Sequence, residues 1–122
     1  MSTHTKNAPV WSSDDERRTL RGVFHVVGLL YDQHKEMPAQ QMQVLFYVAL
    51  NEGNTQRELC RDLGMPVSTA SRNVAALSHV HRLGKEGLGL VTWVDDPEDR
   101  RAKLLTLTSK GQALMRKVLQ TL

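Results

Sequence analysis

Apolar residues recur with helical spacing at the start of the chain. A possible capping box at Ser13 and Glu16 is followed by apolar residues at every third or fourth position until about Gln33. This spacing is typical of an amphipathic helix. Pro38 suits the first turn of a second helix, which has its own apolar stripe and for which Gly53 supplies a left-handed stop.

Two shorter helices follow, joined by a tight turn. A second possible capping box begins at Thr55, and the helix that it opens is expected to end at Gly64. From Val67 onward, apolar residues fall on one face of a fourth helix, which is expected to reach about His81. The pattern therefore predicts a helix-turn-helix unit over residues 55–82.

The periodicity changes in the second half of the chain. Residues 88–94 form a short run rich in β-branched and aromatic side chains, and residues 103–108 form a second run of the same kind. A charged, turn-forming segment separates them. Together they predict a β-hairpin over residues 88–108, which would be the wing that follows a helix-turn-helix unit.

A last helix is predicted over residues 109–122, with Thr108 or Ser109 as its cap. The expected fold class is mainly α with a small β-hairpin (α+β), in the order of a winged helix-turn-helix protein. Residues 13–122 would form this single domain, and residues 1–12 a flexible N-terminal arm. The predicted core consists of Phe24, Leu45, Phe46, Leu59, Leu63, Val74, Leu77 and Leu107.

Composition fits one soluble domain. The chain has 122 residues, of which 40% are apolar and 24% charged, as in ordinary globular proteins. No apolar run approaches the ~20 residues that span a bilayer. The N-terminus lacks the pattern of a signal peptide, and the single cysteine cannot form an internal disulfide. We therefore expect a cytoplasmic protein.

Positive charge gathers in the second half of the chain. The formal net charge is +3. Residues 1–53 hold five Lys or Arg against six Asp or Glu, a balance of −1, whereas residues 54–122 hold eleven against seven, a balance of +4. This distribution is compatible with a polyanionic partner.

The fourth helix carries side chains suited to DNA. In a helix-turn-helix unit the second helix lies in the major groove, where Arg can pair with guanine and Asn with adenine, while hydroxyls bind phosphates or base edges. No acidic residue occurs from Val67 to Val80. The candidate DNA-binding residues of this helix are Ser68, Thr69, Ser71, Arg72 and Asn73. The alternative is an ordinary solvated helix face on which Ser68 helps to cap.

The hairpin carries three further candidates. Arg100 and Arg101 at its tip suit the minor groove or the backbone beside it, and Lys103 follows them. Four acidic residues precede the arginines and would repel phosphate unless some of them pair with Arg side chains and fix their pose. The alternative is a solvated hairpin tip.

Two motifs in and after the hairpin resemble the MarR family of bacterial regulators. Residues 96–103 (DPEDRRAK) and 107–111 (LTSKG) are similar to its wing signature, and residues 68–72 (STASR) resemble its recognition helix. Order and spacing fit from Pro38 to Gly111. The resemblance implies a homodimeric repressor or activator that binds a pseudo-palindromic operator in double-stranded DNA, often released by a small phenolic, lipophilic or oxidant effector.

The first and last helices, 13–34 and 109–122, have apolar stripes larger than one small domain can cover. We therefore expect them to dock across a two-fold axis. The candidate dimerisation residues are Leu20, Val23, Val27, Leu114, Val118 and Leu122.

No set of residues indicates catalysis, and we expect neither an enzyme nor a cofactor. His79 and His81 are two positions apart on a helix and do not suit a shared metal ion, so no metal site is expected. Cys60 fits the core better than an oxidant sensor. The alternative function is a winged-helix module that binds a protein, such as polymerase or another regulator, with weak or no DNA binding.

Overall fold

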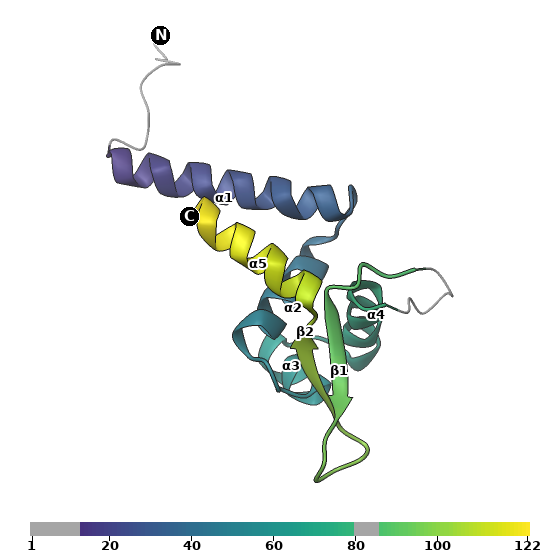
Figure 1. Ribbon diagram of the computed structural model, residues 1–122. Helices are drawn as coiled ribbons and strands as arrows, with labels where there is room; N and C mark the ends of the chain where they lie inside the picture. The colour runs from purple at the N-terminus through teal and green to yellow at the C-terminus, as the bar shows by residue number, and fades with distance from the viewer. Residues whose placement is uncertain (1–12, 80–85) are drawn as a thin grey trace.

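The computed structural model describes residues 13–79 and 86–122, which form five helices and one two-stranded antiparallel sheet (Figure 1). The elements are α1 (Asp14–Gln33), α2 (Ala39–Leu50), α3 (Gln56–Leu63), α4 (Val67–Leu77), β1 (Val91–Asp95), β2 (Lys103–Leu107) and α5 (Ser109–Thr121). The predicted α+β winged helix is confirmed. The arm over residues 1–12 and the end of the helix-turn-helix segment, residues 80–82, lie outside the described residues.

Helices α2 and α3 pack against β2 of the hairpin, and α4 packs on α2 and α3. The hairpin extends away from these helices, while α1 and α5 lie together on the opposite side (Figure 1). The hairpin register pairs Val91 with Leu107 and Asp95 with Lys103. The segment before α3 adds a short bridge to β2, in which Leu105 N–H donates to the Asn54 carbonyl at 2.9 Å. The wing is thus joined by backbone hydrogen bonds to the start of the helix-turn-helix unit.

Local capping chemistry accounts for several helix ends. Both predicted capping boxes are present: Ser13 Oγ accepts from Glu16 N–H at 3.0 Å, and Thr55 Oγ1 accepts from Glu58 N–H at 3.1 Å. Gly64 ends α3 in the left-handed conformation, with φ 61°, which glycine adopts without steric cost.

Other boundaries differ from the expectation by a few residues. Pro38 is the N-cap of α2, with extended ψ of 151°, and not part of its first turn. Helix α2 ends at Leu50, three residues before Gly53. Helix α4 ends at Leu77, since the next residue, Ser78, has an extended backbone with ψ −173°. The Leu77 carbonyl accepts from Leu90 N–H at 2.7 Å, and β1 begins only at Val91.

The core holds most of the predicted residues, with one error. Leu45, Leu59, Leu77, Val74 and Leu107 are buried, and two predicted members, Phe46 and Leu63, are half-buried against the core. Phe24 is 73% exposed, so its assignment to the core was wrong. The face of α1 that packs inward carries Gly22, Val26 and Leu30 instead. Within the described ranges, no helix has the length and apolar content needed to cross a bilayer.

Candidate nucleic-acid interface and dimer surface

Helix α4 presents a polar face opposite the side that it buries. Ser68 and Arg72 are exposed and Thr69 is half-buried, whereas Ala70 and Val74 face the core. The tight turn before α4 is fixed by Met65 N–H, which donates to the Cys60 carbonyl at 2.9 Å. The candidate contacts on α4 therefore lie on a helix whose position is set by its packing on α2 and α3.

Asn73 lies away from this exposed face. Its side chain is buried, with 7% exposed, and its Nδ2 donates to the Thr69 carbonyl at 3.1 Å and contacts Met65 Sδ at 4.0 Å. An amide held in this way cannot form a bidentate pair with adenine. Arg72 remains the candidate base reader of α4.

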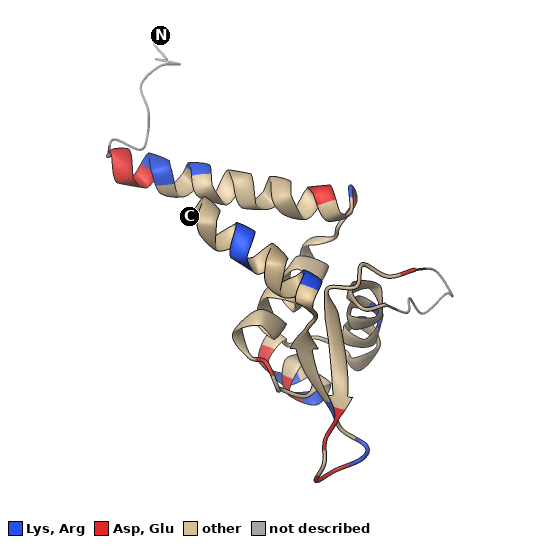
Figure 2. Cartoon of the chain, viewed as in Figure 1, with Lys and Arg blue, Asp and Glu red and all other residues tan. Residues whose placement is uncertain are grey.

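The acidic residues at the hairpin tip shape the turn. Asp96 Oδ1 accepts from Glu98 N–H at 2.9 Å, and Asp99 Oδ1 accepts from Arg101 N–H at 3.0 Å, the short-range bonds by which Asp favours turns. Arg101 Nε lies 3.8 Å from Asp99 Oδ1, yet 96% of its side chain is exposed, and Arg100 is also exposed. Figure 2 shows acidic and basic residues side by side at this tip.

Lys103 is exposed on the hairpin itself. Its Nζ lies 5.0 Å from the centre of the Trp93 ring, a cation–π distance. The contact orients the Lys103 side chain without removing its charge. The three candidate cations of the wing are therefore all accessible.

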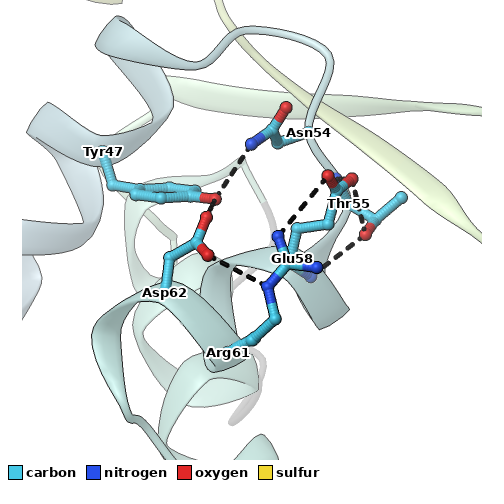
Figure 3. Close-up of polar contacts among 6 residues, drawn as sticks. All are labelled: Tyr47, Asn54, Thr55, Glu58, Arg61 and Asp62. Atoms are coloured by element: carbon cyan, nitrogen blue, oxygen red, sulfur yellow. Dashed lines mark hydrogen bonds and ion pairs between the residues drawn. The ribbon is translucent and has the colours of Figure 1, made fainter.

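A polar network joins α2 to α3 behind the candidate interface (Figure 3). Tyr47 Oη donates to Asp62 Oδ2 at 2.7 Å and accepts from Asn54 Nδ2 at 3.0 Å, while Arg61 Nε donates to Asp62 Oδ1 at 3.0 Å. The hydrogen bonds from Tyr47 and then from Arg61 hold the pKa of Asp62 below its usual value, and burial raises the pKa of Tyr47. The network fixes the first helix of the helix-turn-helix unit on α2.

Replacing Tyr47 with Phe removes this link, and we expect the thermal midpoint to fall by a few degrees at pH 7. Asp62 has a lowered pKa in the folded state, so its contribution is present above the unfolded-state pKa near 4 and is lost as the pH falls through the folded value. The difference in thermal midpoint between wild type and Tyr47→Phe should therefore shrink when thermal unfolding is repeated near pH 3. Tyr31→Phe, at an exposed tyrosine of α1, is the control. Equal differences at both pH values would contradict the assignment to Asp62.

The candidate dimerisation residues divide into two groups. Leu114 and Val118 of α5 are each 4% exposed and belong to the chain's own core, so they are not available to a partner. The exposed candidates are Leu20, Val23, Val27 and Leu122. Phe24 and Tyr31, at 73% and 52% exposed, extend the apolar stripe along α1.

An open groove of about 680 Å³ runs beside this stripe. It is lined by Thr121 at the end of α5 and by seven residues of α1, namely Phe24, His25, Val27, Gly28, Leu29, Tyr31 and Asp32. Gly22 permits the close approach of these helices, because a Cβ there would lie 2.8 Å from Leu122 Cδ2 and 3.2 Å from the Thr121 carbonyl oxygen.

The described part of the chain contains no candidate metal-binding cluster. Residues 13–79 and 86–122 hold no group of three or more His, Cys, Asp or Glu side chains that could share an ion. His79 is exposed, and His81 lies outside the described residues. Cys60 is half-buried on α3.

The comparisons with known proteins agree with this architecture. Residues 36–78 match the model of the MarR family. The transcriptional repressor CouR, solved bound to a 23-mer DNA duplex, is 27% identical with a TM-score of 0.60, covering 87% of this chain and 68% of that one. The regulator Tm0710 from Thermotoga maritima is 28% identical with a TM-score of 0.62, covering 89% and 73%.

A third structure, a MepR–DNA complex from S. aureus, is 20% identical with a TM-score of 0.64, covers 89% of this chain and 82% of that one, and shows similarity of fold. A comparison with curated protein sequences gave no match. The family model covers the segment that contains α2, α3 and α4, and the solved structures extend the similarity to the wing and the flanking helices. Over this segment, and in its overall fold, the chain is similar to winged-helix proteins of the MarR family.

Proposed function

We propose that this protein is a sequence-specific regulator of transcription that binds double-stranded DNA, with α4 in the major groove and the hairpin in the minor groove. The observation that carries the proposal is the pairing of an exposed, acid-free helix face at Ser68 and Arg72 with a hairpin tip that exposes Arg100 and Arg101. The DNA-bound structure of CouR, 27% identical, supports it. Proteins of this family are regulators and not enzymes.

The binding unit is a homodimer in the cytoplasm. The apolar stripe of α1 supports this proposal, because a monomer would leave Val23, Phe24, Val27 and Tyr31 in water. Two-fold symmetry would place two α4 helices on the half-sites of a pseudo-palindromic operator. A small organic effector is part of the proposal; PcaV from Streptomyces coelicolor, 26% identical, is known in complex with its natural ligand. No comparison favours the protein-interaction alternative.

The proposal predicts that Arg72→Ala lowers affinity for a duplex selected from random DNA by roughly 1–3 kcal/mol, because a bidentate contact with one base pair is lost. Preference should relax at one or two positions of the selected site, while a scrambled duplex is affected much less. Affinities on both duplexes measure this difference. Arg116→Ala, which removes an exposed arginine from α5, is the matched control and should bind as the wild type does.

Arg100→Ala and Arg101→Ala should act differently, because contacts with backbone and minor groove position the protein without reading much sequence. Each variant should weaken binding to the selected and scrambled duplexes alike and reduce the slope of log K against log salt by about one unit per phosphate contact removed. A salt titration measures the slope. If all three arginine variants bind both duplexes as the wild type does, DNA reading is ruled out and the protein-interaction alternative takes its place.

A further inference from the structure

Gln56, at the first position of α3, reaches across to the recognition helix. Its Nε2 donates a 2.8 Å hydrogen bond to Ser71 Oγ, fifteen residues further along the chain. Both side chains are half-buried, at the edge where the exposed face of α4 meets α3. Nothing in the sequence pattern marked Gln56, because the contact joins two helices.

The direction of this hydrogen bond determines what Ser71 has left to offer. A serine hydroxyl has one donor hydrogen and two acceptor lone pairs. Hydroxyls within helices often donate to the carbonyl four residues earlier, as Thr19 does to Asp15 at 3.0 Å and Thr121 to Lys117 at 2.9 Å. The Ser71 hydroxyl donates to no carbonyl within the described part of the chain. It accepts from Gln56 instead.

We infer that Gln56 is a positioning residue of the DNA interface, which occupies one lone pair of Ser71 and so leaves the Ser71 O–H to donate to a phosphate oxygen of the bound duplex. This inference rests on the proposed function. When the second helix of such a unit lies in the major groove, the first crosses the backbone, so the edge between α3 and α4 faces phosphates. Phosphate oxygens only accept, and a hydroxyl held as a donor matches them.

The inference predicts a coupled pair of substitutions. Ser71→Ala and Gln56→Ala should each lower affinity about fivefold, the size of one neutral hydrogen bond, and the double variant should lose no more than either single one. The losses should be equal on selected and scrambled duplexes, because a phosphate contact carries no sequence information. The slope of the salt titration should not change, since neither residue is charged.

Gln56→Glu tests the direction of the hydrogen bond. A carboxylate at this position only accepts, so it would draw the Ser71 O–H toward itself and away from DNA. The loss should exceed that of Gln56→Ala, because the donor is captured and a negative charge is added. In a Ser71→Ala background the loss from Gln56→Glu should become smaller, since only the effect of the charge remains.

Gln43→Ala, at an exposed glutamine of α2, is the matched control and should leave affinity unchanged. Thermal unfolding of every variant separates a loss of contact from a loss of fold. Additive losses for Gln56→Ala and Ser71→Ala, or a loss confined to the selected duplex, would overturn the inference while leaving the proposed function intact. A wild-type protein that binds no duplex would overturn both.

Discussion

Gly111→Ala should lower the free energy of unfolding by about 3 kcal/mol, at the upper end of the usual cost of overpacking. A Cβ at this position would lie 2.1 Å from the Leu90 carbonyl oxygen and 3.2 Å from Leu107 Cδ2. The first of these atoms is backbone, and it also accepts from Thr108 N–H at 3.0 Å. It therefore cannot move without disturbing the start of α5. Urea unfolding measures the loss.

The sign of this change is the informative part, because glycine inside a helix is ordinarily replaced by alanine with a gain of roughly 0.5–1 kcal/mol. Gly28 in α1 is the matched control, since a Cβ there would meet nothing within 4 Å. Gly28→Ala should stabilise the protein while Gly111→Ala destabilises it. A gain in stability at both positions would contradict the close contact between Gly111 of α5 and the Leu90 carbonyl before β1.

Val23→Glu should convert the proposed dimer into a monomer at micromolar concentration and lower operator affinity by a factor of about a hundred or more. Val23 is 48% exposed within the apolar stripe of α1, and a carboxylate there would be buried without a partner in a two-fold interface. Operator affinity falls with the dimer because two linked recognition helices bind far more tightly than one. Sedimentation velocity and operator titration give the two readouts.

His25→Glu controls for the added charge. It lies on the same helix, two positions along and therefore on a different side, and it too is exposed. It should leave both the dimer and operator binding in place. A wild type that sediments only as a monomer would refute the dimer, and a dimer unaffected by Val23→Glu would place the interface elsewhere.

The sequence allowed correct predictions where structure depends on neighbouring residues. Each capping box, at Ser13 and at Thr55, joins two residues that are three positions apart, and the left-handed Gly64 directly follows the helix that it ends. The apolar stripe of α1 was also recognised, but periodicity alone does not distinguish a face that packs within the chain from one that is left for a partner. Phe24 was therefore assigned to the core although it is exposed.

The candidate site was harder to predict because it depends on contacts between elements. Asn73 has a side chain suited to reading DNA, but it lies on the buried side of α4 and bonds the Thr69 carbonyl. Gln56 acquires its role only when α3 and α4 meet, and Tyr47 only when α2 packs on α3. Residue type indicates which chemistry is available, but the packing of the helices determines which side chains can use it.

The bridge between Thr55 and Leu104 fixes the spacing between the two parts of the protein proposed to contact DNA, the helix-turn-helix unit and the wing. Because Leu105 shares two backbone hydrogen bonds with the segment just before α3, at 2.9 Å to Asn54 and 2.9 Å to Gly53, the base of the wing cannot swing independently of the helix-turn-helix unit. The distance between α4 and the hairpin is therefore held fixed. An operator half-site in which the two grooves are brought closer or further apart would have to bend to fit the protein, so the local stiffness of the DNA becomes part of the sequence that is recognised.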